Sequence, residues 1–134
     1  VILSWGNVSK IDRDKNLLYI KPSGADLEEI SQYDIAQVST LDGSWVLGMK
    51  PSVDTKIHLE IYKGFSDVGA VVHTHSVHAT AFAQANKPIP CLGTTHADYF
   101  YGEIPCVPQP TAEELDDDYE KYTGLRIVTI FLPH

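Results

Sequence analysis

The sequence has few cysteines and lacks any long apolar run. Its two cysteines, Cys91 and Cys106, match no metal-binding spacing. We therefore expect two reduced packing residues, with a disulfide as the alternative. No stretch approaches the roughly 20 apolar residues of a membrane span, and no basic start followed by an apolar block marks a secretory signal. The sequence thus predicts no membrane partner and a cytoplasmic location.

Basic residues are also scarce. Ten lysines and arginines face 18 aspartates and glutamates, for a formal net charge of −8. Such a surface repels the phosphate backbone of nucleic acids, which we exclude as partners. The 43% hydrophobic content over 134 residues suits one folded domain.

Both ends of the chain resemble the interior of a domain. The sequence opens on Val1–Trp5 without an initiator methionine or a polar lead-in, and residues 127–134 form an apolar run without a polar tail. We expect residues 1–134 to form a single domain that is incomplete at both ends.

Strand and helix patterns alternate along the chain. Apolar runs predict strands at Leu17–Lys21, Ile35–Ser39 and Ser44–Met49, the last two joined at Asp42-Gly43, and a buried strand at Val68–His75. Helical spacing after Pro51 places Ile57, Ile61, Tyr62 and Phe65 on one face. Further helices are predicted at Ala79–Ala85 and at Thr111–Tyr122, with Thr111 as N-cap and Gly124 ending the second. A mixed α/β domain follows.

The pattern His73-Thr74-His75 ends the fourth predicted strand. Residues two apart in a strand share a face and lie about 6–7 Å apart, so the two imidazoles could converge on one metal ion. The alternative is a pair hydrogen-bonded in a core or exposed at a strand end. His78, beyond the strand, is a packing candidate.

Two carboxylates extend this candidate site. Asp54, at the start of the helix after Pro51, could be a third metal ligand or an acid/base group, although helix capping alone would explain it. Asp98 lies in a polar segment between Gly93 and Gly102 that reads as a loop. It could transfer a proton, or be an ordinary turn carboxylate.

Three segments combine small residues with hydroxyl or amide groups: Gly6–Ser9, Lys21–Gly24 and Pro51–Asp54. Backbone N–H groups in such segments can approach a phosphate closely. Ordinary turns explain each of them equally well when it is taken alone.

Five ordered blocks together are more specific than any one motif. They resemble the class II aldolase and adducin family, and within it the L-ribulose-5-phosphate 4-epimerases, up to about Gly124. The resemblance implies a three-layer α/β/α domain around a mainly antiparallel sheet. The blocks are Ser4–Ser9, Lys21–Gly24, Lys50–Thr55, His73–Ser76 and Gly93–Gly102.

The resemblance implies interconversion of L-ribulose 5-phosphate and D-xylulose 5-phosphate by zinc-assisted retro-aldol and aldol steps, in arabinose catabolism and in a homotetramer. By position, the zinc ligands are His73, His75 and Asp54, and Asp98 is an acid/base group supplied across a subunit boundary. The phosphate would be held by Gly6, Asn7, Ser23, Gly24, Ser52 and Val53.

The chain departs from the family in three ways. Val53 replaces a usual serine, so that only its backbone N–H could serve a phosphate. The family's third metal-binding histidine and its late catalytic tyrosine have no match within 134 residues.

Two other functions stay open. A class II sugar-phosphate aldolase would usually carry glutamate at Asp54 and would lack the Ala97–Tyr101 block. A non-catalytic, adducin-like binding module would have no chemical reason to keep both histidines and both aspartates.

Overall fold

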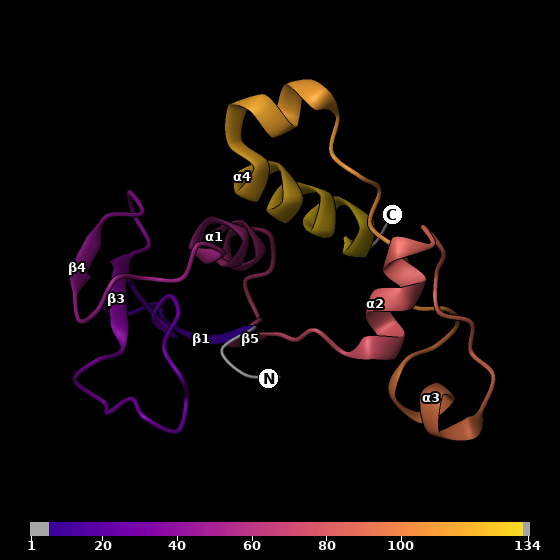
Figure 1. The fold of residues 1–134 in the computed structure, drawn as a ribbon, viewed down its shortest axis with the longest axis horizontal. Helices are drawn as coiled ribbons and strands as arrows, with labels where there is room; N and C mark the ends of the chain where they lie inside the picture. Colours follow the sequence, from indigo (N-terminus) through magenta and orange to yellow (C-terminus); the bar gives the residue numbers. More distant parts are fainter. Residues whose placement is uncertain (1–5, 133–134) are drawn as a thin grey trace. The chain divides into compact units, whose positions relative to one another are not determined.

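The computed structural model describes residues 6–132, which form two compact units (Figure 1). Val1–Trp5 and the last two residues, from which incomplete ends were predicted, lie outside the described part. The first unit comprises residues up to 74 together with those from 110 onward, and the second comprises residues 75–109. The prediction of a single domain stays a prediction.

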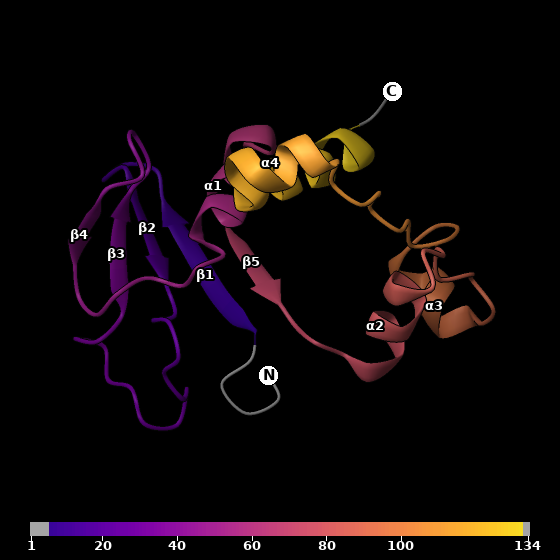
Figure 2. The same cartoon turned by 45° about the horizontal axis from the view of Figure 1, so that its top comes forward.

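The first unit contains a five-stranded antiparallel sheet in the order β4-β3-β2-β1-β5 (Figure 2). Strand β1 pairs with β2 on one side and with β5 on the other. This sheet confirms the mixed α/β fold with antiparallel pairing. The strands are β1 (Asn7–Asp12), β2 (Leu17–Ile20), β3 (Ala36–Ser39), β4 (Trp45–Leu47) and β5 (Ala70–His73).

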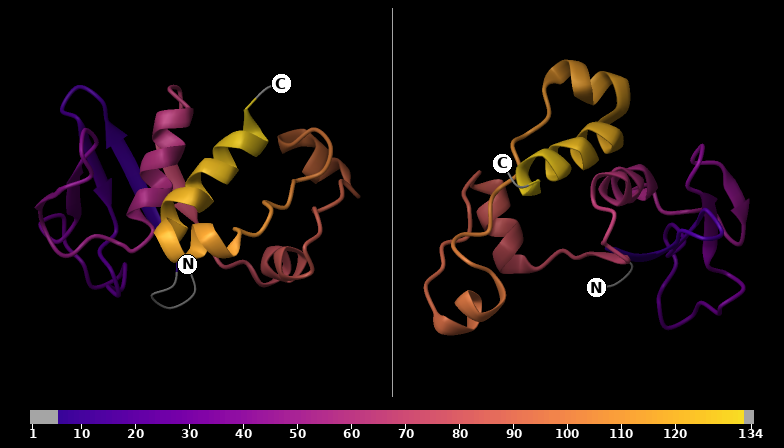
Figure 3. Two further views of the ribbon diagram at one scale, coloured as in Figure 1. Left: turned by 90° about the horizontal axis from the view of Figure 1, so that it is seen from above. Right: turned by 180° about the vertical axis from the view of Figure 1, so that it is seen from behind.

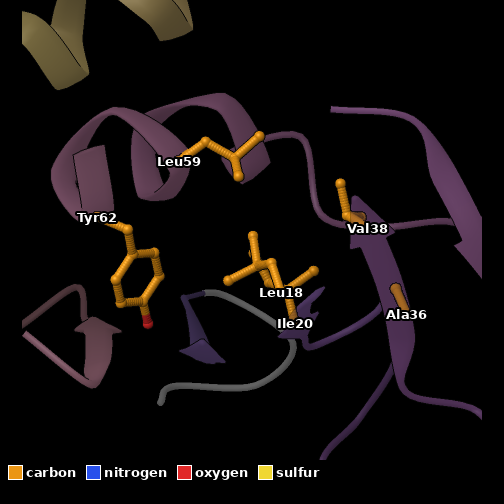
Figure 4. Close-up of a cluster of buried hydrophobic side chains, with 6 residues drawn as sticks. All are labelled: Leu18, Ile20, Ala36, Val38, Leu59 and Tyr62. Atoms are coloured by element: carbon orange, nitrogen blue, oxygen red, sulfur yellow. The ribbon is translucent and has the colours of Figure 1, made fainter. Parts of the chain in front are cut away.

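The hydrophobic core lies between this sheet and helix α1 (Thr55–Gly64) (Figure 4). Side chains two apart in a strand share a face, so β2 turns Leu18 and Ile20 toward the helix. Ala36 and Val38 of β3 do the same, and the helix contributes Leu59 and Tyr62. The core thereby fixes α1 against the sheet.

Helix α4 (Ala112–Phe131) lies beside α1 (Figure 3). Its predicted N-cap is confirmed, because Thr111 and Glu114 form a reciprocal capping box. Gly124 does not end the helix as predicted. A Cβ at that position would lie 2.7 Å from the Glu60 Cβ, so this glycine lets the two helices approach closely. The helical backbone is instead interrupted at Asp118 (φ −154°, ψ 81°).

Two further local predictions are wrong. The strand expected to be buried, β5, lies at the edge of the sheet that residues 6–132 form and pairs there with β1 alone, which leaves Val72 65% exposed. The segment expected to be a loop contains helix α3 (Thr94–Tyr99). Gly93 is extended, and its carbonyl accepts from the Ala97 N–H, so the helix begins directly after it.

The second unit holds α2 (Val77–Gln84) and α3. Helix α2 confirms the helix predicted at Ala79–Ala85, although it begins earlier, at Val77, and it ends before Pro88. Both cysteines are free thiols, as expected, but Cys91 is exposed and packs into no core. None of the helices within residues 6–132 combines the length and apolarity needed to cross a membrane.

Candidate functional site

Three elements of the first unit meet at the carboxylate of Asp54. Asn7 begins β1, Asp54 precedes α1, and His73 ends β5. The Asn7 Nδ2 atom donates to Asp54 Oδ2 at 2.6 Å, and His73 Nδ1 lies 2.9 Å from the same oxygen. Because Asn7 and His73 are direct partners in the antiparallel β1–β5 ladder, the sheet register places both at one end of the helix.

The approach of β1 to β5 at this end depends on Gly6. Its φ is +79°, and a Cβ at this position would lie 2.5 Å from the carbonyl oxygen of His73. A side chain is therefore excluded on two grounds, backbone conformation and space. Gly6 therefore allows β1 to lie close to the backbone of His73.

Ser52 joins this cluster from the loop before α1. Its Oγ accepts from Asn7 Nδ2 at 3.1 Å and from the backbone N–H of Asp54 at 3.3 Å. Its carbonyl accepts from the Thr55 hydroxyl at 2.6 Å. Asp54, although it is the N-cap residue, makes no side-chain capping bond. Capping therefore does not explain this carboxylate, which turns toward the strands.

The Asp54–His73 contact shifts both titrations. The hydrogen bond from His73 holds the pKa of the Asp54 carboxyl below its ordinary value, against the opposing effect of burial. The same bond raises the pKa of the His73 imidazole. Both partners are only partly buried. A carboxylate that orients an imidazole in this way is the usual companion of a metal-binding histidine.

The predicted pairing of His73 and His75 on one strand face is wrong. Strand β5 ends at His73, and His75 lies past it in the second unit. Asp98 belongs to α3 of the second unit and is exposed, as is His78. Among the side chains of residues 6–132, no three histidines, cysteines or acids are grouped to hold a metal ion.

The phosphate candidates lie in neighbouring segments of the first unit, namely the start of β1, the turn after β2 and the loop before α1. The Ser23 N–H donates to the Lys50 carbonyl at 2.9 Å, next to an isolated bridge between Pro22 and Pro51. The Ser23-Gly24 turn is exposed beside the loop that carries Ser52. Val53 is 65% exposed. The predicted segments are therefore adjacent, and Asn7 hydrogen-bonds Ser52 within them.

A buried polar cluster that the sequence patterns did not predict lies beside this site. Ser9 Oγ lies 2.7 Å from His58 Nδ1 and 2.9 Å from the Tyr62 hydroxyl, which also donates to the Ser9 carbonyl at 3.1 Å. All three side chains are at most 2% exposed. Burial lowers the pKa of His58 to about 4, so its imidazole is neutral at pH 7. The available signal was spacing, since Ser9 follows Asn7 by two and His58 follows Asp54 by four.

Comparison with known proteins gives consistent similarities. Residues 1–131 match the family described as Class II Aldolase and Adducin N-terminal domain. The chain is 50% identical over 129 residues to the L-ribulose-5-phosphate 4-epimerase UlaF of Salmonella paratyphi B, covering 96% of this chain and 56% of that relative. It therefore spans little more than half of that protein's length.

Solved structures show the same fold. An L-fuculose 1-phosphate aldolase superposes with a TM-score of 0.79 at 29% identity, covering 94% of this chain and 56% of the aldolase. The L-fuculose-1-phosphate aldolase of Thermus thermophilus superposes with a TM-score of 0.73 at 22% identity, covering 96% of this chain and 60% of that one. The second likeness shows the fold alone.

Proposed function

We propose that this chain, which belongs to the class II aldolase and adducin family, forms part of a sugar-phosphate 4-epimerase that interconverts L-ribulose 5-phosphate and D-xylulose 5-phosphate. The observation that carries the proposal is the 50% identity to an epimerase over 96% of the chain. The convergence of Asn7, Asp54 and His73 next to Ser52 supports it, because it puts candidate metal donors beside candidate phosphate donors.

Two of the proposed ligands, Asp54 and His73, form a donor pair that suits a divalent metal. A carboxylate and an imidazole meet at Asp54 and His73, and such oxygen and nitrogen donors suit zinc. His73 and His75 would hold the ion, and Asp54, which orients His73, would join them. When bound, zinc supplies positive charge that stabilises the negative charge developing as the carbon–carbon bond breaks. The Asp54–His73 bond keeps the imidazole oriented for this task.

The phosphate group would be held by Gly6, Asn7, Ser23, Gly24, Ser52 and Val53. Ser52 Oγ already accepts from Asn7 and from the Asp54 backbone, so its own hydroxyl hydrogen is available for a phosphate oxygen. Val53, with its exposed side chain, offers its backbone N–H. A fixed phosphate keeps the cleaved aldehyde fragment in place, so that its other face can be presented before the bond re-forms.

Asp98 is the proposed acid/base group. It is an exposed carboxylate on α3 of the second unit, accessible to a reacting molecule or to a neighbouring subunit. We propose a homotetramer in which Asp98 of one subunit serves the site of its neighbour. There it moves a proton at the hydroxyl that becomes the carbonyl during cleavage. An Asp98→Asn variant should retain substrate binding while losing turnover.

The experiment supplies L-ribulose 5-phosphate to the full-length protein with zinc and follows both products. Formation of D-xylulose 5-phosphate, abolished by a chelator and restored by zinc, is the expected result. An Asp54→Asn variant should lose most of this activity, and an Asp42→Asn variant, changed in an exposed turn, should keep it. Accumulation of glycolaldehyde phosphate without D-xylulose 5-phosphate would overturn the epimerase assignment.

A sugar-phosphate aldolase is the second candidate, favoured by the 29% identity and TM-score of 0.79 to an L-fuculose 1-phosphate aldolase. Asp54 stands against it, since the usual aldolase has glutamate there. An adducin-like binding module is the third possibility. The absence of any metal from the purified full-length protein would favour it.

A cytoplasmic location and a role in arabinose catabolism complete the proposal. Both follow from the pentulose phosphate substrate, which is made and consumed in sugar metabolism. Deletion of the gene should impair growth on arabinose as the carbon source. Growth equal to that of the parent strain would contradict the role in arabinose catabolism.

A further inference from the structure

Strand β1 and helix α1 are joined by two successive polar contacts. Asn7 bonds Asp54, and two residues further along the strand Ser9 bonds His58, four residues further along the helix. Two strand residues advance roughly 6.6 Å and four helical residues about 6 Å, so the two spacings match. The two contacts therefore lie one after the other between the same two elements. We call Asn7–Asp54 the outer rung and Ser9–His58 the inner rung.

The inner rung, Ser9–His58, is the more buried of the two. Ser9 pairs with Ile20 of β2 and with Val71 of β5, so both neighbouring strands hold its backbone. Tyr62, one turn beyond His58, makes two further hydrogen bonds to Ser9. Its ring projects from α1 toward the sheet (Figure 4). Ser9 is thus a fixed point on the sheet to which two turns of α1 are tied.

The inner rung acts directly on Asp54. The backbone N–H of His58 donates to the Asp54 carbonyl at 3.1 Å, so the His58 side chain anchors the very turn that Asp54 begins. That turn has no side-chain cap of its own. Without a cap, the position of the first turn depends on what its side chains contact in the sheet.

We propose that Ser9 and His58 are positioning residues that hold the start of α1 against β1, so that the Asp54 carboxylate meets Asn7 and His73. Neither touches the reacting groups in this assignment. The effect of this positioning on catalysis rests on the proposed function. The effect of Ser9 and His58 on the position of Asp54 does not. Displacements of about 1 Å are enough to impair a metal or catalytic site.

Four variants of the full-length protein test the proposal. Ser9→Ala and His58→Leu remove the inner rung. His58→Asn also loses the ring but keeps a polar atom at the position of Nδ1, which can still reach Ser9. Val38→Ala is the matched control, because it weakens the same core from β3, a strand that does not pair with β1.

Three measurements separate position from general stability. The Asn7 side-chain amide resonance of the metal-free protein reports its bond to Asp54. Competition with a chromophoric chelator gives zinc affinity, and initial rates give kcat and KM, all well below the unfolding temperature of each variant.

We expect Ser9→Ala and His58→Leu to shift the Asn7 amide resonance, to weaken zinc affinity about tenfold or more and to lower kcat with KM changed less. His58→Asn should lose stability yet keep zinc affinity within about threefold of the wild type, and Val38→Ala should keep all three site readouts. Equal losses in Val38→Ala, or an unmoved Asn7 resonance in Ser9→Ala and His58→Leu, would overturn the proposal. A moved resonance in a protein without epimerase activity would instead refute only the proposed function.

Discussion

His73 Nδ1 lies 2.9 Å from Asp54 Oδ2, which joins the end of the edge strand β5 to the start of α1. These residues are 19 apart in sequence. The β1–β5 ladder brings them together by placing His73 opposite Asn7, whose amide bonds the same carboxylate oxygen. One carboxylate oxygen therefore organises contributions from three elements.

Replacing Asp54 by asparagine should lower the pKa of His73 toward its ordinary value, since the hydrogen bond to the ionised carboxylate raises it. Imidazole NMR titration of metal-free protein measures this. Zinc affinity should fall by about tenfold to 100-fold. Asp42→Asn removes an exposed turn carboxylate and serves as the control. An unchanged His73 titration in Asp54→Asn would contradict the assigned contact.

Gly6→Ala should destabilise the protein by about 1–3 kcal/mol, because alanine disfavours the +79° φ and its Cβ would meet the His73 carbonyl. Gly24→Ala is the matched control. Its φ is also positive, at +69°, but no atom lies within 4 Å of the added Cβ. Denaturant unfolding at pH 7 should show a larger loss for Gly6→Ala. Equal losses would mean that backbone conformation alone matters.

His58 should make the fold sensitive to acid. Its folded pKa of about 4 is below the unfolded value of 6.5, so the unfolded state binds a proton first as pH falls. The contribution to stability is complete above pH 6.5 and is lost between 6.5 and 4. Between pH 8 and 5 the loss should be about 2 kcal/mol.

Urea unfolding of metal-free protein at both pH values, compared with His58→Asn, isolates this contribution. His73 has the opposite sign, because its raised folded pKa adds stability below pH 6.5 that is lost as pH rises through the folded value. The comparison cancels His73, because the asparagine can still reach Ser9 and so keeps Asp54 beside His73. The same pH dependence in His58→Asn as in the wild type would rule out His58 as the acid-sensitive group.

Val53→Ser should improve binding of the sugar phosphate that we propose as the substrate. The added hydroxyl can donate to a phosphate oxygen, and position 53 is exposed enough to accept it without repacking. We expect KM for L-ribulose 5-phosphate to fall about threefold to tenfold with kcat nearly unchanged. Val46→Ser, at another exposed valine, on β4, is the control. A KM equal to that of the wild type would remove position 53 from the phosphate site.

The sequence by itself determined the features that depend on neighbouring residues. The hairpin around Asp42-Gly43, the N-cap at Thr111 and the end of α2 before Pro88 each follow from local backbone preferences. The sequence also predicted Asp54 and His73 as site residues, because a carboxylate at a helix start and a histidine at a strand end can be recognised from the local pattern. The family resemblance rested on these same short blocks.

Only the tertiary structure decided which residues meet. A glycine such as Gly124 is typical of a helix end. In the structure Gly124 instead lies close to Glu60, where it is a contact between α4 and α1. Strand β5 had the composition of a buried strand, but its place at the sheet edge exposes Val72. Ser9 and His58 repeat the spacing of Asn7 and Asp54, but only the structure shows that they meet, since their bond joins residues 49 apart. Local propensity acts over a few residues, whereas burial and hydrogen-bond partners depend on elements far along the chain.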